Sequence, residues 1–265
     1  MTTNILIKDF ILFIFVFMRI GGLIFAAPVL SFKGFPVLAR IFLAIVIAYI
    51  VFLTLNKSNV NIDLDLTNQS GLITLALYSV RELLTGMILG FAMNFIFWAV
   101  SYAGHYIGFD MGLMLAEALN PVQEIQTNIV GQFLYYAAIM IFILINGHHY
   151  LISGLVASFS VAPLGKYVIN EPVYTLLIKY SFLVFTIAIK IASPIIVSFF
   201  LVHLAESIIA RVIPNMQIIY ITQPLKTLLG IFMILSLIPF YVYVLKNLLE
   251  GYEYRLLDLI RAMGQ

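Results

Sequence analysis

The sequence contains histidine and serine side chains that could form a metal site or a catalytic site. His148 and His149 are adjacent and closely precede Ser153, and metal sites and serine-nucleophile sites use these residue types. Neighbouring histidines point to different sides of a helix, however, and no carboxylate lies near them in the sequence. The sequence also lacks the His-Glu-x-x-His, P-loop, Gly-x-Gly-x-x-Gly and Gly-x-Ser-x-Gly motifs. We therefore interpret His148 as part of a structural turn, and predict no catalytic residue, metal or cofactor.

Ionisable side chains also occur inside long apolar stretches. They are Arg19, Arg40, Arg81, Glu82, Lys179, Lys190, His203, Glu206, Arg211 and Lys226. Each would cost about 2.5–3.5 kcal/mol at the centre of a bilayer. Snorkelling and ion pairs within the chain are expected to account for about half of them, and the others would face partner subunits or a hydrated conduit.

Spacing places several of these residues on common helix faces. Lys179 and Lys190 are eleven residues apart, which is about three helical turns. His203, Ser207 and Arg211 follow an i, i+4, i+8 pattern. The predicted buried polar or inter-subunit residues are Arg81, Glu82, Lys179, Lys190, His203, Glu206 and Arg211.

Small residues recur at helical spacing. Gly86 and Gly90 form a small-xxx-small pair, and one stripe of small residues is spaced by four: Gly104, Gly108, Gly112 and Ala116. Such spacing lets helix backbones approach closely. Ordinary packing within the chain and a chain that must bend remain alternatives for these glycines.

The composition indicates a membrane protein. Of 265 residues, 63% are hydrophobic and 10% are charged, against about 25% charged in soluble domains. Fourteen basic and twelve acidic residues give a net charge of +2, and there is no cysteine. These values exclude an ordinary soluble globule, disulfides and thiolate metal sites, and they give no sign of nucleic-acid binding.

Long apolar runs without alternation predict an all-α fold of membrane-type helices, some broken and some overlong. The runs are 10–30, 36–55, 72–107, 129–145, 150–161, 173–213 and 218–249. Those at 72–107 and 173–213 are about twice the hydrocarbon thickness and must bend, break or leave the bilayer, with a kink expected at Ser193-Pro194. The short run 150–161 follows the turn signal Asn146-Gly147, which predicts a helical hairpin of two short arms. Residues 251–265 form an amphipathic tail, and no removable signal peptide is expected.

The chain resembles the FliR family, membrane proteins of the flagellar export gate with counterparts in type III secretion injectisomes. The resemblance covers nearly the full length and rests on motifs distributed along it: Ile107-Gly-Phe-Asp-Met-Gly-Leu, Asn120-Pro121, Gly131-Gln132-Phe133, Asn146-Gly147-His148-His149, Ser158-Phe159, Pro163-Leu164-Gly165, Ala210-Arg211 through Pro214, and Gln223-Pro224-Leu225. Three positions depart from the family pattern, which often has Asp-Pro at 120–121, Pro-Gln at 214–215 and Gly-Phe-Pro-Leu at 222–225. The predicted structural motif residues are Gly104, Gly108, Asn146, Gly147, His148, Pro163, Pro214 and Pro224.

The resemblance implies a single non-enzymatic export-gate domain over residues 1–265. With FliP-like and FliQ-like subunits it would form the channel for unfolded flagellar proteins, in the bacterial inner membrane at the flagellar basal body. FlhB-like and FlhA-like proteins would join the assembly. Residues 107–128 would form a plug, with channel-lining candidates Phe109, Met111, Gly112, Leu113, Met114, Asn120 and Pro121.

Two other function classes stay open. A polytopic secondary transporter also carries charged residues in its membrane helices. An intramembrane protease would need Ser153 to pair with a histidine on another helix, such as His105 or His203.

Overall fold

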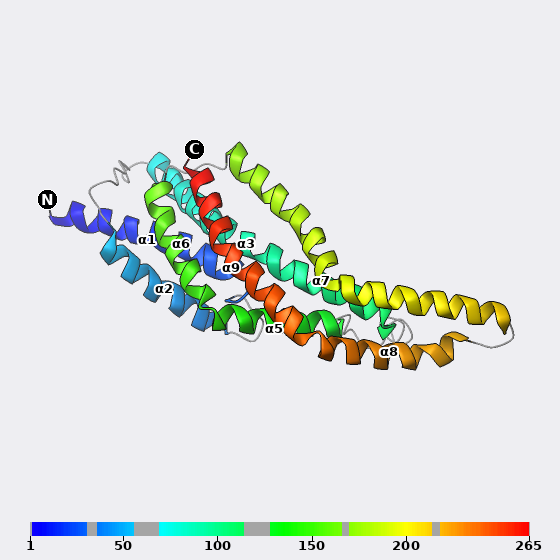
Figure 1. Ribbon diagram of the computed structural model, residues 1–265. Coiled ribbons are helices and arrows are strands. Elements are labelled where there is room, and N and C mark those ends of the chain that lie inside the picture. The colour runs from blue at the N-terminus through cyan, green and yellow to red at the C-terminus, as the bar shows by residue number, and fades with distance from the viewer. Residues whose placement is uncertain are drawn as a thin grey trace. The chain divides into compact units, whose positions relative to one another are not determined.

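The protein is an all-α membrane-type chain, which confirms the predicted fold class. The computed structural model describes residues 2–30, 36–55, 69–113, 128–165, 170–213 and 218–264. Within them lie the helices labelled in Figure 1: α1 (Thr2–Ala26), α2 (Val37–Thr54), α3 (Gln69–Asp110), α5 (Ile129–Leu144), α6 (Gly147–Val161), α7 (Glu171–Val212), α8 (Ile218–Ser236) and α9 (Ile238–Met263).

The helices belong to two compact units. The first comprises Met1–Asn94, Asn146–Tyr180 and Gly251–Gln265, and the second comprises Phe95–Ile145 and Ser181–Glu250. The chain passes between the units inside α3, α7 and α9 as well as at the break between α5 and α6. The single domain predicted over the whole chain stays a prediction.

In the first unit, α1 and α3 lie in backbone contact through glycines. A Cβ atom on Gly22 would overlap the Leu83 carbonyl oxygen, and one on Gly86 would overlap the Arg19 carbonyl oxygen. At Gly90 the Leu23 carbonyl oxygen would lie 2.6 Å from such an atom. The predicted Gly86/Gly90 pair therefore packs within the chain, and its role is to bring α1 close to α3.

The end of α9 packs on α6 in the same unit. A Cβ atom on Gly154 would overlap Leu256, and the Tyr180 hydroxyl donates to the Arg255 carbonyl at 3.0 Å. Tyr252, Leu256 and Leu259 are buried. The predicted amphipathic segment 251–265 is thus continuous with α9, and its apolar face contributes to the core of this unit.

Gly251 of α9 has space for a larger side chain that would stabilise the helix. A Cβ atom on Gly251 would have no heavy atom within 4 Å. Glycine inside a helix costs roughly 0.5–1 kcal/mol relative to alanine. We expect Gly251→Ala to raise the free energy of unfolding in detergent by up to about 1 kcal/mol. Gly154→Ala is the matched comparison, since its methyl group meets Leu256, and equal effects of the two changes would contradict this packing.

Both 42-residue helices are continuous. At 1.5 Å per residue each is about 63 Å long, roughly twice the hydrocarbon thickness. Of the three outcomes predicted for the 72–107 run, a bend, a break or an exit from the bilayer, α3 shows no break. In α7, Pro194 lies inside the helix and leaves the Lys190 carbonyl without its helical donor. The Ser193 hydroxyl donates to that carbonyl at 2.9 Å, which explains how the helix continues through the proline.

Two other apolar runs are broken. The chain bends by 70° between α5 and α6, where Asn146 takes a left-handed conformation with φ 58°. The two short helical arms predicted there are present, and they are joined at this bend. The run 218–249 bends by 58° between α8 and α9 at Leu237, and no bend was predicted there. Pro239 explains this break, because proline fits the first turn of a helix and disfavours helix before it.

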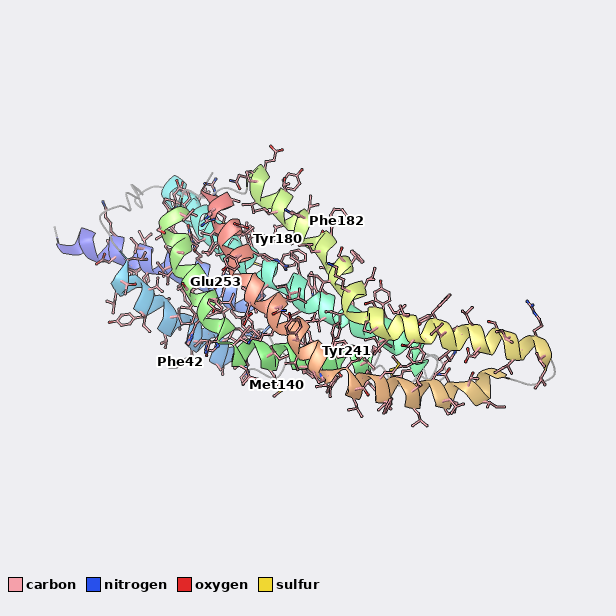
Figure 2. All side chains as sticks on the ribbon, viewed as in Figure 1. Phe42, Met140, Tyr180, Phe182, Tyr241 and Glu253 are labelled. Atoms are coloured by element: carbon pink, nitrogen blue, oxygen red, sulfur yellow. The ribbon has the colours of Figure 1, made fainter. Side chains whose placement is uncertain are left out.

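Many large apolar side chains are exposed on the surface of the protein. Phe42 of α2, Met140 of α5 and Phe182 of α7 are 65–70% exposed, in contrast to the buried Tyr180 and Tyr241 (Figure 2). Among the described residues, four helices are long and apolar enough to cross a membrane, and up to six spans result if each bent pair counts as one. The surface matches a membrane-embedded protein.

Candidate functional site

A buried ion pair lies at the centre of the first unit. The Arg19 Nε atom of α1 donates to the Glu82 Oε2 atom of α3 at 2.6 Å, and the two side chains are 0% and 1% exposed. Charges in such surroundings are tolerated only when they are paired and hydrogen-bonded. Glu82 was predicted as a buried polar residue, and the structure gives it a partner within the same chain.

The rest of the Arg19 guanidinium binds the C-terminal end of α6. Its Nη1 atom donates to the Ser158 carbonyl at 3.0 Å, and its Nη2 atom donates to the Ala162 carbonyl at 2.9 Å. The ring of Phe159 lies 4.5 Å from the guanidinium carbon. The Ser158 carbonyl also accepts from the Ala162 amide at 2.9 Å, and the C-terminal end of a helix carries partial negative charge, so a cation there is favourable.

The second Glu82 oxygen fixes the turn that follows α6. The Gly165 amide donates to Oε1 at 2.7 Å, and Gly165 has φ 75°, a conformation that favours glycine. The predicted motif residue Pro163 lies exposed in this turn. The Arg19–Glu82 pair therefore joins α1, α3 and the end of α6. The guanidinium and the carboxylate both form hydrogen bonds to groups of the same chain.

A second charged cluster lies on α7 and α8 in the other unit, where α8 runs back alongside the C-terminal part of α7 (Figure 1). The Lys226 Nζ atom lies 2.7 Å from Glu206 Oε2, with side chains 11% and 18% exposed. His203 Nδ1 lies 3.2 Å from that oxygen and 3.2 Å from Lys226 Nζ. One ring nitrogen cannot accept from the ammonium and donate to the carboxylate together, so the tautomer of His203 decides which bond forms.

Removing the cation from this cluster is expected to destabilise the protein. Lys226→Met leaves a mostly buried carboxylate without its strongest donor, and we expect a loss of about 1.5–3 kcal/mol in unfolding free energy. The matched control is Lys246→Met, because Lys246 and Glu250 are 3.7 Å apart with side chains about half exposed. An exposed pair of this kind contributes about 0–1 kcal/mol. Equal losses in detergent unfolding would refute the importance of the α7–α8 pair.

The glycine stripe near the end of α3 packs against the start of α5. A Cβ atom on Gly104 would overlap Gly131, and one on Gly108 would overlap the Asn128 side chain. Asn128 caps α5, since its Oδ1 atom accepts from the Val130 amide at 2.9 Å and its Nδ2 atom donates to the His105 carbonyl at 3.3 Å. These glycines let the start of α5 lie directly on α3.

The last residues of α3 meet α8. The Met111 carbonyl accepts from the Gln223 amide at 3.0 Å and from the Thr227 hydroxyl at 3.2 Å. Met111 is 1% exposed, whereas Phe109 is 66% exposed. Gly112 has φ 73°, and a Cβ atom there would overlap the Gln223 side chain. Among the predicted plug residues, Met111 is therefore packed against α8 and Phe109 faces outward.

The other predicted residues are distributed more widely. Arg81, Lys179, Lys190 and Arg211 are exposed, and Pro224 lies inside α8. The rings of His148 and His149 lie 4.3 Å apart at the start of α6, directly after Asn146 and Gly147. Leu113 is half-buried. Met114, Asn120, Pro121 and Pro214 lie outside the described residues.

Several residues of these clusters were missed as candidates. Arg19 and Lys226 were recognised as ionisable residues in apolar runs, but neither was selected as a site residue. Asn128, Gln223 and Thr227 had no signal beyond their polarity, although Asn128 stands directly before an apolar helix, which is an N-cap signal. In the described part of the chain, no three His, Asp or Glu side chains lie close enough together to hold a metal ion.

Comparison with known proteins identifies the family. The family model for "Bacterial export proteins, family 1" matches residues 10–252. The flagellar biosynthetic protein FliR of Bacillus subtilis is 29% identical over 247 residues, with 92% of each chain covered. FliR of Escherichia coli is 29% identical over 93% of this chain and 91% of its own length. FliR of Buchnera aphidicola from Acyrthosiphon pisum is 32% identical over 64% of this chain and 66% of its own. Because the matched region contains most of both compact units, this chain belongs to family 1 of the bacterial export proteins.

Proposed function

We propose that this chain is a membrane-embedded, structural subunit of the flagellar protein export apparatus. The observation that carries the proposal is the match to proteins named FliR over about nine-tenths of both chains. The protein then acts by forming part of a passage, and its buried polar groups serve packing.

We further propose that the chain builds this passage together with FliP-like and FliQ-like subunits in the bacterial inner membrane, at the flagellar basal body. FlhB-like and FlhA-like proteins join the assembly. Support comes from the exposed charged residues Arg81, Lys179, Lys190 and Arg211, which lie on otherwise apolar helices. Such residues are costly in lipid but acceptable against protein or water. Helices of about 63 Å also favour a protein covering for the parts beyond the bilayer.

Within that passage we propose that the end of α3 contributes to the seal. Phe109 offers an exposed ring and Leu113 a half-buried apolar side chain nearby, while the buried Met111 holds this segment against α8. A hydrophobic constriction of this kind blocks ions by excluding water. Phe109→Ser is expected to increase ion leakage through assembled complexes while assembly continues, and unchanged ion tightness would contradict the seal.

The test of the function is purification of the tagged chain from its native membrane in a mild detergent, followed by mass measurement of the complex and of its components. A discrete large complex with two further small helical membrane proteins is the expected result. An unrelated polytopic membrane protein with the same tag is the control for adventitious capture. A stable monomer that binds a small solute would overturn the proposal in favour of a transporter.

A further inference from the structure

We infer that α8 clamps the end of α3 and that Gln223 is a positioning residue for the seal. This inference rests on the proposed function. The clamp consists of Gln223, Thr227 and Gly230 of α8, which hold Met111 and Gly112. All of these residues lie in the second compact unit.

The clamp begins with a carbonyl that has no donor in its own helix. The Met111 amide continues the helix by donating to the Ile107 carbonyl at 3.0 Å, and the Gly112 amide turns back to the Phe109 carbonyl at 2.9 Å. Carbonyls at the end of a helix need donors from elsewhere. Gln223 and Thr227 supply both donors to the Met111 oxygen, so α8 provides the cap of α3.

The contacting residues of α8 form one stripe. Gln223, Thr227 and Gly230 are spaced by four and three residues, which places them on one face of the helix. Gly230 is buried, and a Cβ atom there would overlap the Met111 side chain. Thr227 also donates to the Gln223 carbonyl at 3.1 Å. Gln223 and Thr227 therefore bind the backbone carbonyl of Met111 with two hydrogen bonds. The Met111 side chain fills the space beside Gly230, where any other residue would have a Cβ atom.

The backbone at Gly112 completes the fit. Its positive φ is a conformation that other residues rarely adopt, and the Gln223 side chain occupies the space where a Cβ atom would stand. Gln223 thus contacts both residues at the end of α3.

The bonds of the clamp have the strength that a reversible contact needs. Both are hydrogen bonds between neutral groups, and each changes an equilibrium by only a few-fold. The buried ion pair of the first unit is far costlier to break. Since Phe109 lies two residues before Met111 and faces outward, the clamp fixes the position of its ring relative to α8. Loosening the clamp should therefore weaken the seal without affecting assembly.

The first test measures ion conductance of purified export complexes in planar lipid bilayers. Gln223→Leu and Thr227→Val each remove a donor to the Met111 carbonyl, and each is expected to raise the conductance of the resting complex roughly two- to twelve-fold. Asn247→Leu makes a similar change on an exposed part of α9 and is the control. Normal conductance of both variants would overturn the inference.

The second test uses the absence of cysteine from the chain. Met111→Cys combined with Gly230→Cys places the only two thiols of this chain where the two residues now touch. Oxidation is expected to join α3 to α8 and to stop export of flagellar proteins, and a reductant is expected to restore it, whereas each single variant should be insensitive to both. Normal export by a cross-linked complex would overturn the clamp. Absence of the large complex from the co-purification of the unaltered chain would instead overturn the proposed function.

Discussion

Replacing Glu82 by leucine is expected to lower the free energy of unfolding by about 3–5 kcal/mol, because it leaves the Arg19 guanidinium buried without a counter-charge. Leucine approximates the volume of glutamate, so the loss reports the charge and the bond to the Gly165 amide. The measurement is equilibrium unfolding of the purified protein in mixed detergent micelles, together with the amount of chain that accumulates in the membrane.

Two further variants separate the buried charge from other effects. Arg81→Ala changes the neighbouring residue, which is exposed and lies 5.6 Å from the Tyr78 ring, and it should cost about 0.5–1 kcal/mol. The double variant Arg19→Leu with Glu82→Leu removes both charges and should be more stable than Glu82→Leu alone. A double variant less stable than the single one would show that the bonds of Arg19 to α6, and not charge pairing, dominate this region.

Gly86→Ala is expected to prevent normal packing of α1 on α3. The added methyl group would overlap the Arg19 carbonyl oxygen and lie 2.9 Å from the Leu23 amide nitrogen. Both are backbone atoms, so the overlap can be relieved only by moving a whole helix. We expect a loss of about 3 kcal/mol or more in unfolding free energy and a marked fall in the accumulated protein.

Gly21→Ala provides the matched control, since a Cβ atom on Gly21 has no heavy atom within 4 Å. Alanine is the better helix former, so this change should be neutral or stabilise the protein by up to about 1 kcal/mol. Comparable losses from Gly21→Ala and Gly86→Ala would mean that helix propensity, and not the close approach of α1 and α3, decides the outcome.

The fold class and the family could be predicted because their signals are spread along the chain. Long apolar runs predict helices, and motifs such as Asn146-Gly147-His148-His149 predict the family, which the family match confirms. The bend between α8 and α9 was missed although Pro239 gave a local signal for it. The kink expected at Ser193-Pro194 stays a prediction, and the hydrogen bond from the Ser193 hydroxyl to the freed Lys190 carbonyl had no signal in the sequence.

The clusters were harder to predict because their partners are distant in the sequence. Glu82 stood out as a charge in an apolar run, but its arginine is 63 residues away, and two of that arginine's acceptors are backbone carbonyls. Backbone acceptors have no signature in the amino-acid sequence. The same holds for the Met111 carbonyl, which Gln223 reaches across 112 residues. The roles of the predicted site residues stay predictions.

The bonds of Arg19 also impose an order on biosynthesis. The Ala162 carbonyl, which accepts a hydrogen bond from Arg19, is 143 residues further along the chain. At about 5–20 residues per second, ribosomes make that carbonyl roughly 7 to 29 s after Arg19. Glu82 is made 63 residues after Arg19, so for most of this interval the guanidinium has its carboxylate partner but lacks the carbonyl acceptors of α6. The complete set of Arg19 bonds that fixes α1 in the first unit therefore forms only after α6 has been synthesised.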